Sequence, residues 1–323
     1  MKPLASLSLD LDNEWSYLKT HGDPAWADYP SYLDRAVPRF LGLLGELGLR
    51  ITVFVVGQDA ADARNHEAIA SVARAGHEIG NHSQRHEPWF HLYSEAEIDA
   101  ELAEAEAHIE RVTGVRPTSF RGPGYSLSQP TLRVLLRRGY RIDASTLPTF
   151  LGPLNRLYYF RTAKLSEEEK QRRGRLFGTF REGLRPLRPY RWKLDGGSLI
   201  EIPVTTLPLA RLPFHLSYVL YLSRFSPVLA RAYFATALAM CRVVGLGPSV
   251  LLHPLDFLGG EDAPSLAFFP GMQISAQVKL ARVRSYLEGF ARRFEVRTLG
   301  EHADGLVRGP GLREIVPRFP AEP

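Results

Sequence analysis

The sequence is poor in cysteine and has no hydrophobic run that fits a membrane-spanning helix. Its single cysteine, Cys241, excludes an internal disulfide and is typical of a reducing compartment. The first residues lead directly into a predicted strand without the apolar core of a signal peptide, so we expect a cytoplasmic protein. Arginine and proline interrupt the long apolar stretch at residues 207–244. We interpret this stretch as one or two core helices, which either serve the core alone or form an interfacial amphipathic surface as well.

The sequence also lacks tandem repeats and low-complexity segments. Its 323 residues are 45% hydrophobic and 23% charged, which is the ordinary balance of a folded globular protein and not that of a disordered chain. This length allows either one large barrel or two ordinary domains.

Positive charge is concentrated in one segment. The whole chain has a formal net charge of +5, whereas residues 156–193 hold 12 lysines and arginines against 4 glutamates, or +8, which leaves −3 elsewhere. Such a segment is either a solvated basic face or a contact surface for phosphate groups or an anionic membrane. No nucleic-acid reading module accompanies it, so we do not expect nucleic acid as a partner.

Strand-like and helix-like segments alternate along the chain, which predicts parallel βα units and an α/β fold. A long loop is expected at residues 13–30, an insertion that carries specificity at 149–195, and a loose tail at 309–323, so that residues 1–308 form one domain. Predicted strands lie at residues 6–12, 50–57, 77–83, 117–121, 140–144, 198–206, 249–255 and 294–299, and predicted helices at 31–49, 59–75, 95–112, 130–138 and 274–293.

Two acids follow one another closely at the end of the first predicted strand, in the segment SLSLDLDNEW. Side chains alternate faces along a strand, so Asp10 and Asp12 share the face opposite to the leucines. Acids at the carboxyl end of such a strand are typical of the catalytic rim of an α/β barrel. The alternative is a surface strand with two solvated acids.

Two histidines follow the third predicted strand, in the segment GNHSQRH. His82 and His86 are four residues apart, which on one helical turn places both imidazoles on one face as a clamp for a divalent metal. Two histidines and one acid leave positions open for water and substrate, and this ligand set suits zinc, cobalt or nickel. Of Asp10 and Asp12, one is then a ligand and the other a general base. The alternative is a pair of exposed histidines without a ligand.

Three further residues lie at the ends of later strands. Arg121 is placed to hold the base ionised through a charge-assisted pair. His253 is placed to protonate a leaving amine, and Asp143 to orient that histidine.

Five segments, SLDLD, GNHSQRH, FRGPGY, RIDAS and LLHPLDF, together resemble the motifs of the polysaccharide deacetylases of carbohydrate esterase family 4. The resemblance covers residues 4–145 and 198–257. It implies an irregular barrel of seven or eight βα units and metal-assisted hydrolysis of an amide. The roles that it implies are general base for Asp10, metal ligands for Asp12, His82 and His86, orientation of the base for Arg121, general acid for His253, and support of that acid for Asp143.

The sequence departs from the family pattern at three motifs. The two acids of the first motif are usually adjacent, and their spacing here resembles a subgroup with intracellular members. The third motif has Gly124 before Tyr125 where an aromatic residue usually follows the proline, so the amide of the oxyanion hole belongs to one of these two residues. The fourth motif lacks the usual tryptophan, which questions the standard sugar groove.

The resemblance implies a metal-dependent hydrolase that removes an acetyl or formyl group from an amino sugar. Residues 201–215 look similar to relatives that act on formamido-arabinose linked to undecaprenyl phosphate. With the basic insertion and the apolar helices, this similarity predicts a lipid- or phosphate-linked sugar and contact with an anionic membrane at its cytoplasmic face. The alternatives are a cyclic-amide hydrolase of the same superfamily and a non-catalytic carbohydrate-binding barrel.

Overall fold

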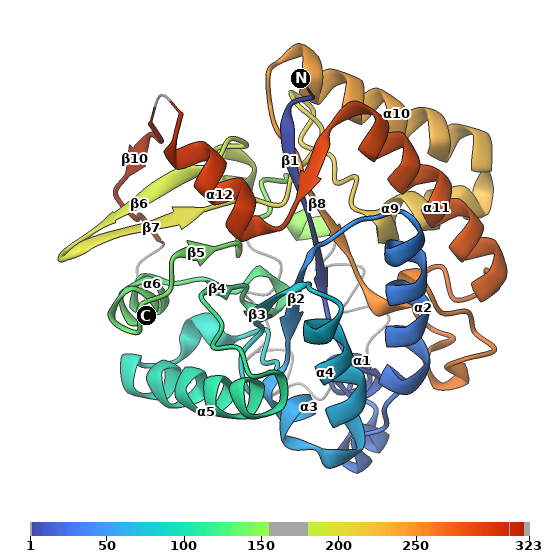
Figure 1. The fold of residues 1–323 in the computed structure, drawn as a ribbon, viewed down its shortest axis with the longest axis horizontal. Coiled ribbons are helices and arrows are strands. Elements are labelled where there is room, and N and C mark those ends of the chain that lie inside the picture. The colour runs from blue at the N-terminus through green and yellow to red at the C-terminus, as the bar shows by residue number, and fades with distance from the viewer. Residues whose placement is uncertain (1, 155–179, 310, 320–323) are drawn as a thin grey trace.

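A computed structural model of the chain describes residues 2–154, 180–309 and 311–319, and its centre is one mostly parallel sheet (Figure 1). The strand order is β10-β6-β7-β5-β4-β3-β2-β1-β8, with β9 paired to β1, and only the β6–β7 pair is antiparallel among the described strands. The strands are β1 (Leu4–Asp10), β2 (Thr52–Val55), β3 (Glu78–Asn81), β4 (Ser119–Phe120), β5 (Ile142–Asp143), β6 (Tyr190–Leu194), β7 (Gly197–Glu201), β8 (Ser249–Leu252), β9 (Glu295–Arg297) and β10 (Glu314–Ile315).

Strand β1 pairs with β2 and β8 along its two edges, and both of its faces are buried, one toward the barrel interior and one under the outer helices. Leu7 and Leu9 are fully buried on one face, and Ser6 and Ser8 on the other. The small serines leave room inside the barrel, and the acid appears only where the strand ends. Because β1, β2 and β3 are parallel neighbours, their carboxyl ends meet at one rim.

The sheet curves back on itself to form an irregular barrel. Just after β7, the amide of Thr205 donates a hydrogen bond to the carbonyl oxygen of Ser249 at the start of β8, over 2.9 Å. The Thr205 hydroxyl in turn accepts from the Ser249 amide at 2.8 Å. These bonds join two distant parts of the strand order, and the predicted α/β barrel is confirmed.

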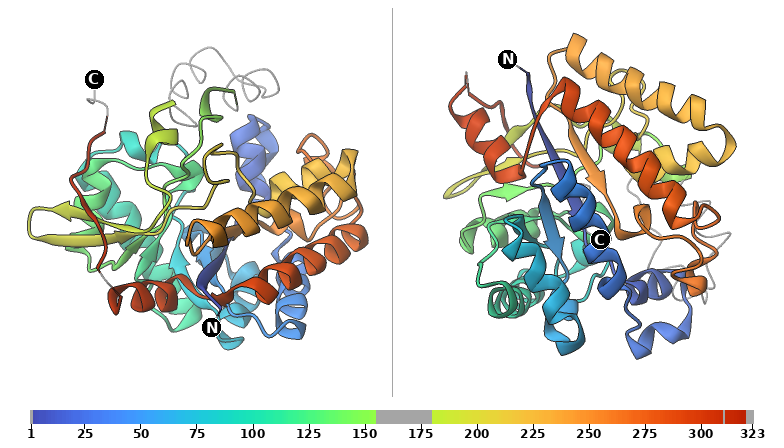
Figure 2. Two further views of the ribbon diagram at one scale, coloured as in Figure 1. Left: turned by 90° about the horizontal axis from the view of Figure 1, so that it is seen from above. Right: turned by 45° about the vertical axis from the view of Figure 1, so that its right-hand side comes forward.

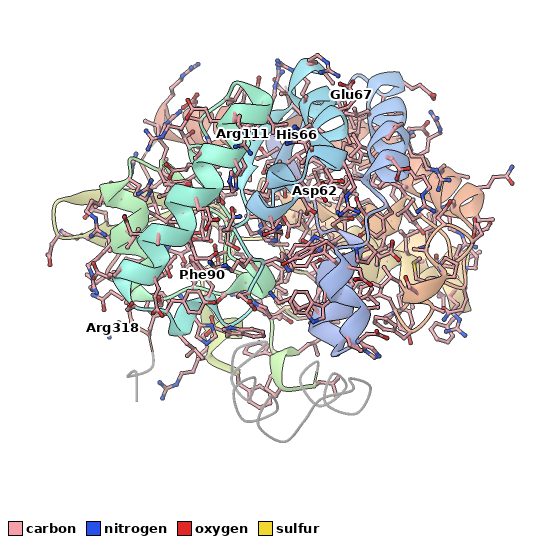
Figure 3. All side chains as sticks on the ribbon, turned by 90° about the horizontal axis from the view of Figure 1, so that it is seen from below. Asp62, His66, Glu67, Phe90, Arg111 and Arg318 are labelled. Atoms are coloured by element: carbon pink, nitrogen blue, oxygen red, sulfur yellow. The ribbon has the colours of Figure 1, made fainter. Side chains whose placement is uncertain are left out.

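Helices cover the outside of the sheet, with α2, α10 and α11 on one side and α5 and α6 on the other (Figure 1). Figure 2 shows α10 and α11 running side by side, and Figure 3 shows α4, with His66 at its start, next to α5, which carries Arg111. None of the helices in the described ranges is long and apolar enough to cross a membrane. The helices are α1 (Glu14–His21), α2 (Leu33–Glu46), α3 (Gly57–Ala61), α4 (His66–Arg74), α5 (Glu95–Thr113), α6 (Gln129–Arg137), α9 (Leu216–Phe225), α10 (Pro227–Val243), α11 (Ala276–Arg293) and α12 (Leu299–Val307).

The segment after β1 is not the long loop that the sequence predicts, because residues 14–21 form helix α1 and residues 24–28 form a 3-10 helix. The side chain of Asn13 caps α1 by accepting from the amide of Glu14 at 2.8 Å. Gly22 ends the helix with a φ of 81°, in the left-handed region that favours glycine. Caps at both ends therefore stabilise a helix within a segment rich in aspartate and proline.

The C-terminal tail and the insertion also differ from expectation. The tail is not loose throughout: β10 pairs with β6, and the ring of Phe319 packs 6.1 Å from that of Trp192. The last part of the predicted insertion is likewise ordered as the β6–β7 hairpin. Residues 155–179, which carry most of the basic charge of the insertion, lie outside the described residues.

Candidate active site

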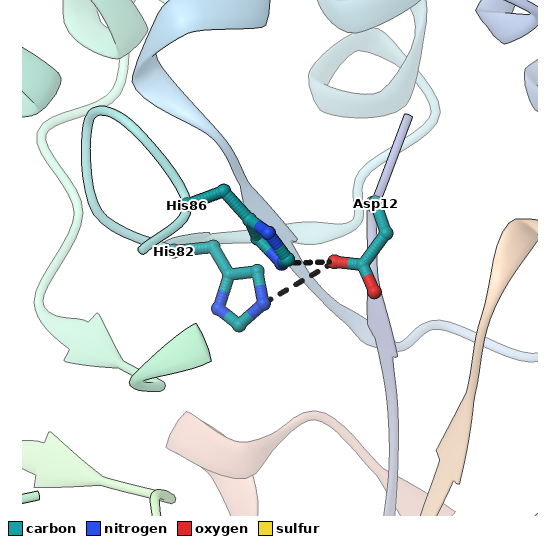
Figure 4. A group of neighbouring side chains, drawn as sticks. All are labelled: Asp12, His82 and His86. Atoms are coloured by element: carbon teal, nitrogen blue, oxygen red, sulfur yellow. Dashed lines mark ion pairs between the residues drawn. The ribbon is translucent and has the colours of Figure 1, made fainter. Parts of the chain in front are cut away.

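Three side chains from two loops meet at the carboxyl ends of β1 and β3 (Figure 4). The Asp12 Oδ1 atom lies 3.0 Å from His86 Nε2 and 3.3 Å from His82 Nε2. All three residues are buried, and their ligand atoms lie within 4.8 Å of one another. The structure therefore brings together the three residues that the sequence predicts as metal ligands.

The donor atoms of this cluster fit a divalent cation. Asp12 Oδ1 and His86 Nε2 are buried without a hydrogen-bond partner among the described residues. His82 Nδ1 lies 2.6 Å from the carbonyl oxygen of Arg121, which only accepts, so Nδ1 carries the proton and Nε2 keeps its lone pair for a metal. Two imidazole nitrogens and one carboxylate oxygen are ligands that suit zinc.

The electrostatics of the cluster also favour a cation. Burial would raise the pKa of Asp12, but His86 and His82 beside it hold that pKa well below its ordinary value. Burial would lower the pKa of His82, but the carboxylates of Asp10 and Asp12 outweigh it and raise that pKa. The carboxylates of Asp10 and Asp12 thus stabilise positive charge beside them at His82.

The two histidines do not lie on a helix, so that part of the prediction is wrong. Ser83 and His86 have φ angles of 64° and 51°, which break a helix. Side-chain oxygens accept hydrogen bonds from the backbone amides of this loop. Asn81 Oδ1 accepts from the Ser83 amide at 2.8 Å, and Glu101 Oε2 accepts from the Gln84 amide at 3.1 Å. These bonds hold a loop that still directs both imidazoles to one point.

Asp10 lies beside the cluster and is paired with a buried arginine. Arg121 Nη1 donates to Asp10 Oδ1 over 2.6 Å, and Arg121 Nε donates to the carbonyl oxygen of Ala144 over 2.9 Å. The guanidinium stacks 4.5 Å from the ring centre of Phe54. Asp10 Oδ2 faces the cluster, 4.0 Å from His82 Nε2. The predicted pairing of Arg121 with the first acid is present.

Asp143 contacts other partners than His253, contrary to the expectation from sequence. The register of β5 and β7 places Asp143 opposite Glu201, and the two buried carboxyls interact directly. Burial raises the pKa of both, and the neighbouring carboxyl raises that of Glu201 further, so a proton is shared between them. Asp143 also accepts from the Ser145 hydroxyl, which accepts from the Gly122 amide at 2.8 Å. It thus supports the loop after Arg121.

His253 follows β8 and is held by residues that sequence reasoning missed. Its Nδ1 lies 3.0 Å from the hydroxyl of Ser217, at the start of α9. That hydroxyl donates to Asp256 Oδ1 over 2.7 Å, and Asp256 Oδ2 accepts from the His253 amide at 2.9 Å. The LLHPLDF motif contains Asp256 three residues after His253, a spacing that fits an amide cap, whereas no local pattern indicates Ser217.

A second missed histidine connects His253 to the rest of the site. The ring centres of His215 and His253 lie 5.8 Å apart. Burial, followed by the charges of His253 and Arg121, holds the pKa of His215 well below its ordinary value, so it is neutral at neutral pH. The charges of His253 and of Arg121 thus both act on the ring of His215.

Gly124 and Tyr125 form a tight turn with φ angles of 57° and 62°. The Tyr125 amide donates to the carbonyl oxygen of Gly122 at 2.9 Å. Within the described chain, no hydrogen bond occupies the Gly124 amide. Of the two amides that the sequence leaves open for an oxyanion, that of Gly124 is the one free to donate.

A further buried acid supports the loop that carries Asp12. Asp59 Oδ1 accepts from Asn13 Nδ2 at 2.7 Å and from Trp15 Nε1 at 2.9 Å. Burial raises the pKa of Asp59 to about 7. The adjacency of Asn13 and Trp15 to the acid motif is visible in the sequence, but their partner on α3 is not.

Comparisons with known proteins show what the sequence and the fold resemble. Residues 26–142 match the polysaccharide deacetylase family model. A peptidoglycan deacetylase of Helicobacter pylori is 28% identical over 165 residues, 49% of this chain and 53% of the relative, and a peptidoglycan deacetylase-like protein of Gibberella zeae is 29% identical over 150 residues, 45% and 44% of the two chains. The matches thus span about half the length of these relatives.

Solved structures share the fold. A protein from Mycobacterium smegmatis described as a polysaccharide deacetylase superposes with a TM-score of 0.66 at 21% identity, over 99% of this chain and 96% of its own. An allantoinase superposes with a TM-score of 0.55 at 16% identity, over 93% and 89% of the two chains. At these identities the likeness shows the fold alone. The match to the polysaccharide deacetylase family model is confined to residues 26–142, and the solved structures show the shared fold.

Proposed function

We propose that this chain is a metal-dependent hydrolase of the polysaccharide deacetylase family that removes the acyl group from an N-acylated amino sugar. The observation that carries the proposal is the convergence of Asp12, His82 and His86 on one point, beside an aspartate held by a buried arginine. A cluster of ligands next to a candidate base, at the rim of a barrel, is the arrangement that metal-assisted hydrolysis requires.

Asp12 Oδ1, His82 Nε2 and His86 Nε2 would hold the cation. When bound, zinc or another divalent ion supplies Lewis-acid polarisation of the acyl oxygen. The Arg121 carbonyl holds a proton on His82 Nδ1, so Nε2 is the ring nitrogen that would face the cation.

Asp10 acts as the general base. Arg121 occupies its Oδ1 and leaves Oδ2 directed at the cluster, where it takes a proton from the attacking water. The oxygen of that water bonds to the acyl carbon, and the amide of Gly124 donates to the oxygen that gains negative charge.

His253 acts as the general acid. As the bond between the acyl carbon and nitrogen breaks, His253 Nε2 gives a proton to the leaving nitrogen, so the products are a free amine and a carboxylic acid. Its Nδ1 is engaged with Ser217, which leaves Nε2 for this transfer.

The test is to incubate zinc-loaded protein with N-acetylglucosamine oligomers and to follow loss of the acetyl group by mass spectrometry. An N-formylated sugar and allantoin are the parallel substrates, because they represent the deformylase and cyclic-amide alternatives. Loss of acetyl that depends on zinc supports the proposal. Turnover of allantoin alone would replace it with the cyclic-amide activity, and no turnover of any substrate would favour a binding barrel.

We also propose that the chain meets its substrate at an anionic lipid surface. The corner between α9 and α10 exposes Phe225, Val228 and Leu229, whose exposed fractions are 68%, 76% and 62%. From residue 202 to residue 255 the sequence has four arginines and no acid. Arg224 lies within this corner and is exposed. Apolar side chains beside unopposed positive charge suit an anionic bilayer surface, where each arginine contributes about 1 kcal/mol.

Vesicle flotation tests the lipid proposal independently of catalysis. The protein should float with vesicles of phosphatidylglycerol and phosphatidylcholine and less with phosphatidylcholine alone. The double variant Phe225→Ser and Leu229→Ser should lose flotation, whereas Val316→Ser, which changes an equally exposed side chain of the tail, should keep it. A protein that stays in the soluble fraction with both vesicles contradicts the lipid proposal and leaves the hydrolase proposal untouched.

A further inference from the structure

A serine hydroxyl bridges His253 to a buried carboxylate. Ser217 Oγ lies 3.0 Å from His253 Nδ1 and donates to Asp256 Oδ1 over 2.7 Å. Ser217 comes from the first turn of α9 and Asp256 from the 3-10 turn after β8, so the bridge joins two separate elements. Neither residue belongs to the metal cluster or to the Arg121–Asp10 pair.

The hydrogen bonds of Asp256 and Ser217 determine which atoms of the bridge donate and which accept. Both oxygens of Asp256 accept, from the Ser217 hydroxyl and the His253 amide, which is the bonding pattern of an ionised carboxyl. A hydroxyl has one hydrogen, and that of Ser217 is committed to Asp256. Its oxygen therefore accepts from His253, so His253 carries a proton on Nδ1 and presents Nε2 to the site.

Buried cationic and polar groups keep Asp256 in place. The ammonium group of Lys279 donates to the carbonyl oxygens of Leu255 and Leu258, both at 2.7 Å, and so clamps the turn that carries Asp256. Burial raises the pKa of Asp256, while His253, Ser217 and Lys279 act against that rise. The titratable and charged side chains around the bridge are His215, Tyr218, Lys279, Tyr17, Tyr32 and Arg121.

We propose that Ser217 and Asp256 are positioning residues that hold His253 as the general acid, in the place where the sequence predicts Asp143. Asp143 is engaged with Glu201 and Ser145 and contributes to the Arg121 loop instead. When His253 carries both protons, its positive charge is linked through the hydroxyl to the Asp256 carboxylate, which stabilises it. After Nε2 gives its proton to the leaving nitrogen, Nδ1 keeps its own, so the ring needs no change of tautomer or orientation. This inference rests on the proposed role of His253 in the hydrolase.

The first test reads the imidazole directly and does not need turnover. Long-range nitrogen–proton NMR spectra of the zinc-loaded protein should show His253 protonated at Nδ1 with a free Nε2. Ser217→Ala should mix or reverse this tautomer, whereas Ser217→Thr, which keeps the hydroxyl, should retain it. Ser223→Ala is the matched control, because Ser223 lies on the same helix and its hydroxyl bonds to the Leu220 carbonyl at 2.6 Å.

The second test is kinetic. Ser217→Ala and Asp256→Asn should lower kcat for N-acetylated sugar by on the order of 10²-fold with little change in KM. Ser217→Thr should recover most of the kcat, and Ser223→Ala should keep it.

The two tests separate the failure of the inference from the failure of the proposed function. If the protein has no hydrolase activity, the proposed function is refuted. If His253 nevertheless shows the predicted tautomer and loses it in Ser217→Ala, the conclusion that Ser217 sets this tautomer still holds. An active protein in which Ser217→Ala changes neither the tautomer nor kcat overturns the inference. Circular dichroism melting of each variant confirms that it is folded.

Discussion

The pairing of Arg121 with Asp10 makes a prediction about stability that does not depend on the substrate. Arg121 is fully buried and Asp10 is 5% exposed, so neither charge has water to replace its partner. Removing one member of a buried pair leaves an uncompensated charge and costs about 3–5 kcal/mol in the free energy of unfolding. We therefore expect Arg121→Met to lose about this much.

A double-mutant cycle isolates the contribution of the pair. Arg121 also donates to the Ser8 hydroxyl and to the Ala144 carbonyl, and Met loses those bonds in any background, so they cancel in the cycle. In the Asp10→Asn background no carboxylate is left unpaired. Arg121→Met should then cost less than in the wild type by about 1.5–3 kcal/mol, the value of a hydrogen bond to a charged group.

The assay is urea unfolding followed by tryptophan fluorescence for the wild type, both single variants and the double variant. A chelator is present throughout, so that metal binding adds nothing to the measured stability. Equal slopes with denaturant show that the variants unfold from comparable states. Single-variant costs that add within about 0.5 kcal/mol would refute the energetic coupling of Arg121 and Asp10.

Three other predictions concern stability. Because burial raises the pKa of Asp59 from 3.8 to about 7, the folded protein between these pH values binds a proton that the unfolded chain has released. The free energy of unfolding should therefore fall by on the order of 4 kcal/mol as pH rises through this range. Asp59→Asn should remove that fall. If the free energy of unfolding falls equally with pH in the wild type and in Asp59→Asn, the prediction is contradicted. Gly122→Ala should destabilise the turn that carries Gly124 and reduce kcat, because a Cβ at Gly122 would lie 2.0 Å from the carbonyl oxygen of Ser126. An unchanged melting temperature and unchanged turnover would refute this clash. Removing the metal with a chelator should lower the melting temperature, since binding to the folded state alone stabilises it, and an unchanged melting curve would argue against a metal at this site.

The features that the sequence predicts correctly are those set by local geometry. The alternation along β1 places Asp10 and Asp12 on one side of the barrel, and the structure has both carboxylates facing His82. The apolar segments mark the strands and most helices because burial imposes their periods. The rim position of each motif follows from the parallel order of the strands.

The errors arise where long-range contacts override local spacing. A separation of four residues suits a helix, but Glu101 of α5 captures the amides of the loop between His82 and His86. Asp143 follows its strand as expected, yet the pairing of β5 with β7 places it against Glu201, 58 residues away in the chain. Neither partner can be identified from the residues that precede or follow the motif.

The loop predicted after β1 shows a related limit. Aspartate, proline and aromatic residues there suggest irregular structure, but the Asn13 cap and the left-handed Gly22 define helix α1. The side chain of Asn13 also reaches Asp59 on α3, so the same residue caps a helix and supports the loop that carries Asp12. Residues with such double roles are recognised only in three dimensions.

The central claim is that two aspartates of the same strand end have different tasks, and one matched pair of variants tests it. Asp10→Asn and Asp12→Asn make the same chemical change two residues apart, and bound zinc and turnover are measured on the same purified samples. We predict that Asp10→Asn keeps its zinc and loses turnover by about 10²- to 10⁴-fold, whereas Asp12→Asn loses both. Loss of zinc from Asp10→Asn with retention in Asp12→Asn, or undiminished turnover in Asp10→Asn, would contradict the division of roles.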